Sequence, residues 1–133
     1  MTYILDANAM IAILNDEPGA ELLGRILSPK GTVRYAHAIN VCEVFYDALR
    51  ESGEDKAQEA LADIQSLGIE TRSDMDDELW QSAGRVKASH RISLADAFAI
   101  AFTLKVNGRL LTSDHHELDA LASAGVCPIT FFR

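Results

Sequence analysis

The 133-residue sequence has few of the residues that cross-link small proteins or break their helices, with two cysteines and three prolines. Cys42 and Cys127 belong to no CxxC or Cys/His spacing, which argues against a disulfide framework and a cysteine-based zinc site. We expect both thiols to be reduced and buried as small hydrophobic side chains. No apolar stretch approaches the ~20 residues that a membrane span needs, and residues 1–10 lack the basic segment of a signal peptide. We therefore expect a soluble, cytoplasmic protein without a membrane partner.

Basic residues are also scarce. Twelve lysines and arginines stand against 20 aspartates and glutamates, which gives a formal net charge of −8. A protein that held nucleic acid mainly by neutralising phosphates would be basic, so any nucleic-acid partner must be held locally or through bound cations. The motifs GxGxxG, GxxxxGK(S/T), HExxH and GxSxG are absent. Nucleotide-cradle, zinc-protease and α/β-hydrolase functions therefore lack support.

Hydrophobic residues make up 48% of the chain, which excludes a disordered or low-complexity protein. The length is that of one ordinary domain, and no internal repeat or linker divides the sequence. We expect residues 1–133 to form a single domain.

Short β-prone segments alternate with longer helical segments along the chain. The expected strands cover 2–5, 33–36, 69–71, 109–112 and 128–131. The expected helices cover 7–15, 20–27, 39–50, a segment that opens at 52–55 and ends at 67, 73–89 with Ser73 as its N-cap, 94–106 and 115–124. No Asn-Gly or Asp-Gly hairpin joins two strands, so the connections cross over and the sheet is parallel. We predict a three-layer α/β domain with about five strands.

Two aspartates directly follow predicted strands. Asp6 comes after the first strand, and Asp114 comes after the strand at 109–112. Residues just beyond the carboxyl ends of parallel strands line the ligand crevice of an α/β sheet. Each aspartate also precedes a helix, so taken singly each is better explained as an N-cap.

Two further acids lie on helices. Asp96 is the one charged residue between positions 94 and 104, and a helix that is apolar on all sides is buried. Its carboxylate must then be paired, hydrogen-bonded or bound to metal, although Ser93 and Asp96 also have capping-box spacing. Glu43 shares one stripe of its helix with Asn40 and Asp47, which alone indicates an exposed polar face.

Together, these four acids indicate a cation site. Carboxylates ~6 Å apart repel each other by roughly 3 kcal/mol at an effective dielectric constant of about 20. A cluster of them is tolerated only if it is protonated or holds a cation, and oxygen ligands suit Mg²⁺ or Mn²⁺. Such an ion can activate water and bind a phosphoryl oxygen, as in phosphodiester hydrolysis.

The same residues, in order and spacing, resemble the pattern of the PIN-domain family, and within it the VapC-type ribonuclease toxins. The resemblance covers essentially the whole chain. Its motifs are Asp6-Ala7-Asn8 after the first strand, Asn40-x-x-Glu43, Ser93-Leu94-Ala95-Asp96-Ala97 and Leu111-Thr112-Ser113-Asp114.

The resemblance implies a Rossmann-like five-stranded parallel sheet with strand order 3-2-1-4-5, which makes strands 1 and 4 neighbours. It implies an endoribonuclease that depends on Mg²⁺ or Mn²⁺ and is the toxin of a type II toxin–antitoxin pair. Its partners would be an RNA substrate, a cognate antitoxin and a second copy of the chain. The implied catalytic and metal-binding residues are Asp6, Glu43, Asp96 and Asp114, with Asn8 and Ser93 orienting ligands.

The sequence departs from the family pattern at two places. Ala7 stands where a threonine is common, and His116 stands where members often carry another acid, with Glu117 as a substitute for it. A basic stretch before Ser93 offers candidate RNA contacts, although a solvated helix face explains it equally well. These candidates are Arg85, Lys87 and Arg91.

Two other functions remain open at this point. A phosphohydrolase with an aspartyl nucleophile would need Asp-x-Asp after strand 1, whereas position 8 is asparagine. A phospho-receiver or a catalytically degenerate binding module would use a similar sheet, but a receiver needs an acceptor aspartate after strand 3. It would also leave Asp96, in its apolar helix, unexplained.

Overall fold

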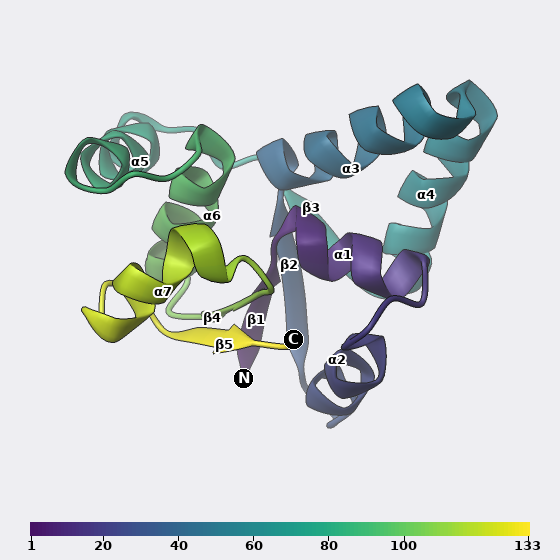
Figure 1. Ribbon diagram of the computed structural model, residues 1–133, viewed down its shortest axis with the longest axis horizontal. Coiled ribbons are helices and arrows are strands. Elements are labelled where there is room, and N and C mark those ends of the chain that lie inside the picture. The colour runs from purple at the N-terminus through teal and green to yellow at the C-terminus, as the bar shows by residue number, and fades with distance from the viewer.

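The structure, a computed structural model, describes residues 1–133 and contains five β-strands and seven α-helices (Figure 1). The strands are β1 (Thr2–Leu5), β2 (Val33–His37), β3 (Glu70–Arg72), β4 (Arg109–Thr112) and β5 (Ile129–Phe131). The helices are α1 (Ala7–Leu14), α2 (Ala20–Leu27), α3 (Ala38–Ser52), α4 (Glu54–Ser66), α5 (Asp77–Ser89), α6 (Leu94–Lys105) and α7 (His115–Ser123). Neighbouring strands all pair in parallel, in the order β3-β2-β1-β4-β5. The predicted α/β class and the implied strand order are confirmed.

Helices cover both faces of the sheet, which gives the molecule three layers. One face packs against α5, α6 and α7, and the other against the helices α1 to α4 (Figure 1). Successive strand residues point to opposite faces, so Ile4 and Leu110 join the first hydrophobic cluster while Leu5 and Leu111 join the second. The central strands β1 and β4 are therefore apolar on both sides, as parallel strands usually are.

Helix α6 is buried along most of its length, as its apolar sequence predicts. All residues from Ala95 to Thr103 are buried, and Ile100 and Phe102 lie completely inside the cluster with α5 and α7. Asp96 therefore occupies the first turn of a helix that has little contact with water.

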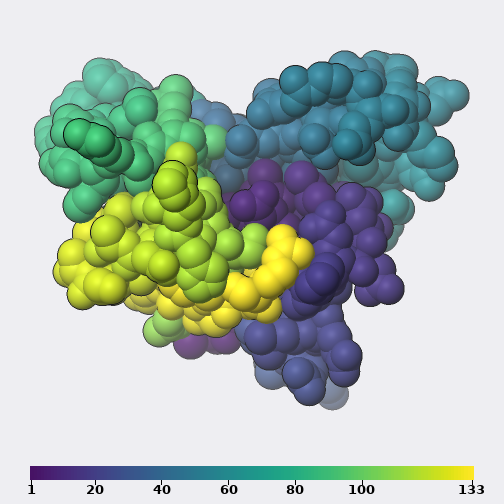
Figure 2. Space-filling view, viewed as in Figure 1, coloured from purple at the N-terminus to yellow at the C-terminus, as the bar shows by residue number.

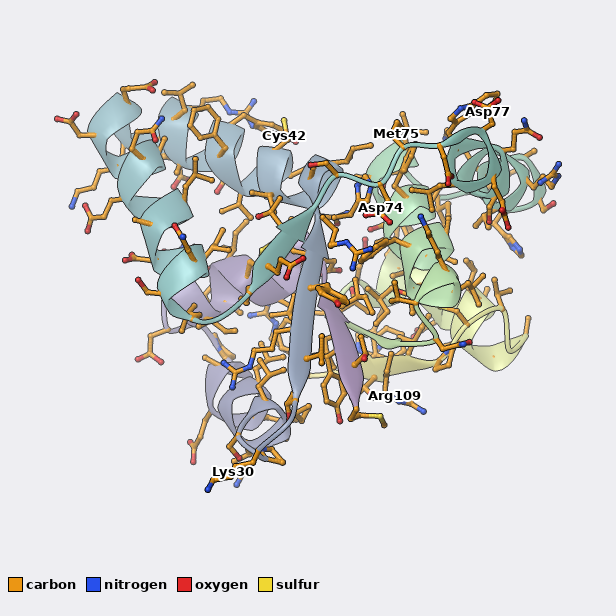
Figure 3. All side chains as sticks on the ribbon, turned by 180° about the vertical axis from the view of Figure 1, so that it is seen from behind. Lys30, Cys42, Asp74, Met75, Asp77 and Arg109 are labelled. Carbon is orange, nitrogen blue, oxygen red and sulfur yellow. The ribbon has the colours of Figure 1, made fainter.

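Helix α5 begins later than predicted. Its N-cap is Asp76 and not Ser73, because the Asp76 carboxylate accepts a hydrogen bond from the backbone N–H of Leu79 at 2.9 Å. Figure 3 shows the chain crossing from β3 past Met75 to Asp77, the first residue of α5. The acidic run at 74–78 thus belongs partly to a loop.

Asp74 explains why this segment is a loop. Its carboxylate pairs with Lys105 of α6 at 2.7 Å and with Arg72 of β3 at 3.0 Å, and these cations hold the pKa of Asp74 at about 2. Its backbone carbonyl accepts a hydrogen bond from Nε2 of the buried His37 at 2.8 Å. These contacts fasten residue 74 to the sheet and to α6, where it cannot extend α5.

The two cysteines are free, and only Cys127 is buried. The prediction that both are buried was wrong for Cys42, which is exposed because α3 turns it away from the buried side chains of Val41 and Val44. No helix combines the length and the apolar character that crossing a membrane requires.

The core around α6 can be tested by a pair of substitutions in that helix. We expect Phe102→Ala to lower the free energy of unfolding by about 3–5 kcal/mol, because it empties a fully buried position. Leu104→Ala, in the same helix but 41% exposed, should cost about 1 kcal/mol or less. Urea unfolding followed by circular dichroism measures both values. Equal losses would contradict this packing of α6.

Candidate metal-binding site

The carboxyl ends of β1 and β4 lie side by side because these two strands pair directly. Leu5, the last residue of β1, is in register with Leu111, and the backbone N–H of Asp6 donates to the carbonyl of Leu111 at 3.3 Å. Asp6 follows β1, and Asp114 lies just beyond β4. The two aspartates therefore leave the sheet at one edge, in the position where parallel α/β sheets bind ligands.

Both aspartates also cap helices. Oδ1 of Asp6 accepts a hydrogen bond from the backbone N–H of Ala9 at 2.8 Å and begins α1. Oδ1 of Asp114 accepts from the backbone N–H of Glu117 at 3.1 Å and begins α7. The capping interpretation is thus confirmed for both residues, and it does not remove either of them from the crevice.

Thr112, a residue without a predicted role, links the two aspartates. Its hydroxyl oxygen accepts a hydrogen bond from the backbone N–H of Asp114 at 3.0 Å. The hydroxyl also hydrogen-bonds to the side chain of Asp6, which lowers the pKa of that carboxyl. Thr112 is fully buried, and buried hydroxyls need partners. In the sequence, this role was indicated by a threonine at the end of a buried apolar strand.

Helices α3 and α6 bring further side chains to the same edge. Asp96, 8% exposed, comes from the first turn of α6, where its backbone N–H donates to the cap Ser93 at 3.1 Å. The half-buried Glu43 comes from α3. One turn earlier, Nδ2 of the fully buried Asn40 donates to the carbonyl of Ala95 at 3.4 Å, which ties the start of α3 to that of α6. Oδ1 of Asn40 has no hydrogen-bond partner.

These side chains line one cleft of about 180 Å³, called the acidic cleft below. In Figure 2 the surface is hollowed between the yellow-green α7 and the purple start of α1. The cleft contains every predicted ligand and orienting residue, and also Glu117, the substitute for the acid missing at position 116. Its lining residues are Asp6, Ala7, Asn8, Glu43, Ser93, Asp96, Asp114 and Glu117.

The candidate RNA contacts do not line the cleft. Arg85 donates to Gln81 on the surface of α5 at 3.3 Å, and Nζ of Lys87 donates to the backbone carbonyl of Ile92 at 2.9 Å. Arg91 is exposed in the loop that leads to α6. Lys87 therefore stabilises the entry into α6, and the structure does not bring these three side chains to the acids.

Burial and like charge raise the pKa of Asp6 and of Glu43. Desolvation is the largest cause for Asp6, whose pKa rises to about 6, and the charges of Asp114 and Glu43 add to it. The hydrogen bonds from Thr112 and Ala9 oppose that rise. Glu43 also has a raised pKa, because of burial and then the charge of Glu117. The cleft thus holds more negative charge than it can solvate.

Asp96 and Glu117 share a hydrogen bond that shifts their pKa values in opposite directions. Burial, and then the hydrogen bond with Glu117, raise the pKa of Asp96 far above its usual range. The same hydrogen bond lowers the pKa of Glu117. Asp96 is therefore the protonated partner and donates to the Glu117 carboxylate when no cation is bound.

The chemistry of these side chains fits a hard divalent cation. Asp96, Asp114 and Glu117 each offer one carboxylate oxygen, and these oxygens lie within 4.8 Å of one another. Asp6 and Glu43 line the same cleft, and no cysteine or histidine does. Mg²⁺ and Mn²⁺ prefer all-oxygen ligand sets, whereas zinc and copper favour sites with nitrogen or sulfur ligands.

Comparison with known proteins agrees with this architecture. The model of the PIN domain family matches residues 3–123. No curated protein sequence matches the chain. The chain belongs to the PIN-domain family, which is the family that its four sequence motifs resemble.

Solved structures with the same fold include VapC-type toxins. VapBC2 from Rickettsia felis, bound to a DNA fragment from its promoter, is similar with a TM-score of 0.76 at 16% identity, over 98% of each chain. VapBC-1 from nontypeable Haemophilus influenzae gives a TM-score of 0.72 at 18% identity, over 99% of this chain and 98% of the other. Mycobacterium tuberculosis VapC20, a sarcin–ricin loop cleaving toxin, gives 0.64 at 17% identity, over 81% and 86%. At these identities the likeness shows a common fold.

The raised pKa of Asp96 makes a prediction about stability and pH. Between the unfolded-state pKa near 4 and the raised folded-state pKa, unfolding releases the Asp96 proton, so stability falls as the pH rises through this range. Asp96→Asn keeps a neutral side chain at every pH. We expect it to exceed the wild-type protein in unfolding free energy by an amount that grows from pH 5 to pH 8, to on the order of 1–3 kcal/mol.

Urea unfolding in EDTA at the two pH values measures this difference. Asp63→Asn, an exposed change on α4 outside the cleft, is the control and should show little difference from wild type at either pH. A difference for Asp96→Asn that shrinks toward pH 8 would contradict the protonated state of Asp96.

Proposed function

We propose that the chain is an endoribonuclease that depends on Mg²⁺ or Mn²⁺ and hydrolyses RNA phosphodiester bonds. The observation that carries this proposal is the convergence of five carboxylates at the carboxyl ends of β1 and β4. The other residues that line the cleft are Ala7, Asn8 and Ser93. Membership of the PIN family supports it. The described activity of VapC20, cleavage of the sarcin–ricin loop, supports RNA as the substrate class.

Asp6, Glu43, Asp96 and Asp114 would hold the cation. When bound, Mg²⁺ or Mn²⁺ supplies positive charge that polarises the scissile phosphate and makes water a better nucleophile at neutral pH. Helix N–H groups and Thr112 hold the carboxylates of Asp6 and Asp114 in place, so these two residues would bind the cation from fixed positions.

Glu43 would have a second role, and two polar side chains would orient the reactants. Glu43 is less buried than Asp6 and Asp96 and has a raised pKa, which suits it to accept the proton of the attacking water. Asn8 and Ser93 line the cleft with polar side chains and would direct ligands by hydrogen bonds. The water oxygen would then bond to phosphorus while the phosphorus–oxygen bond to the leaving nucleotide breaks, and the leaving oxygen would take up a proton from solvent.

The negative charge of the acidic cleft also suits inhibition by a basic segment of a partner protein. We infer that the chain is the toxin of a type II toxin–antitoxin pair, because VapBC and FitAB complexes share its fold. The net charge of −8 favours an antitoxin segment that carries arginine or lysine into the acidic cleft. A cytoplasmic location and a homodimer complete this proposal.

The alternatives receive less support from the side chains. A phospho-receiver needs an accessible acceptor after the third strand, but Asp74 is occupied by Arg72 and Lys105. An aspartyl-nucleophile phosphohydrolase needs a second acid where Asn8 stands. A catalytically degenerate module remains the alternative that the assay below would reveal.

The proposal predicts cleavage that a chelator abolishes. Purified protein would be incubated with total RNA and with tRNA in Mg²⁺, Mn²⁺ or EDTA, and the products separated on denaturing gels. We expect discrete fragments with either metal and none in EDTA. Asp6→Asn and Asp96→Asn should each lower the rate at least ~100-fold, about 2.7 kcal/mol of transition-state stabilisation.

Two controls make the result interpretable. Asparagine is as good an N-cap as aspartate, so Asp6→Asn should keep α1 and the circular dichroism spectrum of the wild-type protein. Asp119→Asn removes an exposed charge outside the cleft and should cleave at the wild-type rate. Cleavage that persists in EDTA, or in a folded Asp6→Asn protein, would refute the metal-dependent mechanism.

A further inference from the structure

Basic side chains are scarce around the acidic cleft, although an RNA strand would need them there. None of the residues that line the cleft is basic. The three predicted RNA contacts lie elsewhere, and Arg72 and Lys105 are occupied by Asp74. Each phosphate of an RNA strand carries a negative charge, and an ion in the cleft would neutralise charge only at the reacting phosphate. The neighbouring phosphates need a basic group at the rim.

Arg133 is the basic residue whose side chain bonds to the loop between β4 and α7. Its Nη2 donates to Oγ of Ser113, the residue before Asp114, at 3.3 Å. Its Nη1 donates to the backbone carbonyl of Pro18 at 3.1 Å and pairs with Glu17 at 3.5 Å. Among the twelve lysines and arginines, no other side chain bonds to this loop. The guanidinium therefore lies between the loop that leads to Asp114 and the loop between α1 and α2.

The backbone that carries Arg133 is fixed to the sheet. The N–H of Phe132 donates to the carbonyl of Thr112 at 3.1 Å, and the Phe132 side chain is buried. His115 stacks on Phe131 with ring centroids 4.1 Å apart, and its Nε2 hydrogen-bonds to the backbone carbonyl of Arg133 at 2.7 Å. Figure 2 shows the yellow end of the chain between α7 and the purple-blue α1–α2 segment, on the same face as the acidic cleft.

The Arg133 side chain keeps hydrogen-bond donors for a ligand. A guanidinium has five N–H groups, and Ser113, Pro18 and Glu17 engage three of them. The Nε–H and one N–H of Nη2 have no partner in the protein. The side chain is 37% exposed, so a ligand can reach it. Two N–H groups of one guanidinium suit a pair of phosphate oxygens.

We propose that Arg133 binds the RNA backbone at a phosphate next to the one that is cleaved. The inference rests on the proposed endoribonuclease function and adds to it a substrate contact outside the acidic cleft. Arg133 would set where the strand enters the cleft, beside Asp114, without holding the metal ion. It supplies the local positive charge that a chain with a net charge of −8 needs in order to hold RNA.

The test measures RNA binding separately from cleavage. Fluorescence anisotropy would give the dissociation constant of fluorescein-labelled oligouridine for the full chain at several salt concentrations, with Ca²⁺ in place of Mg²⁺. We expect Arg133→Gln to weaken binding at least about fivefold at low salt. The slope of log affinity against log salt concentration should fall by about 0.7, the contribution of one phosphate contact on a single strand. A purely structural role would leave this slope unchanged.

Two further variants separate phosphate binding from total charge and from folding. Arg50→Gln removes the same charge from the exposed last turn of α3 and should keep the wild-type affinity within about twofold. Glu17→Gln removes the acid that pairs with Arg133 and should tighten RNA binding, because the guanidinium is then free for phosphate. If Arg133→Gln does not fold, unchanged or weaker binding by Glu17→Gln would overturn the proposal.

The outcomes distinguish this inference from the proposed function. Wild-type affinity and salt slope in a folded Arg133→Gln protein would overturn the phosphate contact, and cleavage by the same protein would leave the nuclease intact. A wild-type protein that neither binds oligouridine nor cleaves RNA would refute the proposed function and the role of Arg133 with it.

Discussion

The site depends on one electrostatic constraint, the placement of several carboxylates at the N-terminal ends of helices. Helices α1, α6 and α7 all begin at the acidic cleft, with Asp6, Ser93 and Asp114 as their caps. The positive end of a helix stabilises a nearby carboxylate by about 0.3–1 kcal/mol, whereas two carboxylates ~6 Å apart repel by roughly 3 kcal/mol. The helix ends therefore hold the acids in place without neutralising them, and the remaining charge is met by a proton on Asp96 or by a cation.

The capping bonds explain how one residue serves fold and site together. A cap needs one carboxylate oxygen, and Asp6 and Asp114 each use Oδ1 for this purpose. The backbone that must turn from strand to helix at these positions thus also fixes the direction of the acid. Thr112 and Asn40 extend the same framework, because the first links the two aspartates and the second joins α3 to α6.

Much of this arrangement was predictable, and the exceptions share a cause. Short apolar strands, the buried α6 and the four acids follow from local patterns, and the strand order follows from the family resemblance. The start of α5 was placed at Ser73 because the acids at 74–78 resemble a helix first turn, while Asp74 is held by Lys105, 31 residues away. The burial predicted for Cys42 was wrong, and the roles of Lys87 and Glu117 were left open, because their surroundings come from distant parts of the chain.

The sequence by itself determined the element order, the parallel sheet and the identity of the acids, since alternation and burial patterns are local properties that each segment carries with it. Only the tertiary structure decided which oxygens meet. The pairing of β1 with β4 puts Asp6 beside Asp114, and the hydrogen bond between Ser93 and Glu117 spans 24 positions. Such contacts depend on how segments pack in space. The number of residues between two positions does not give the distance between their side chains.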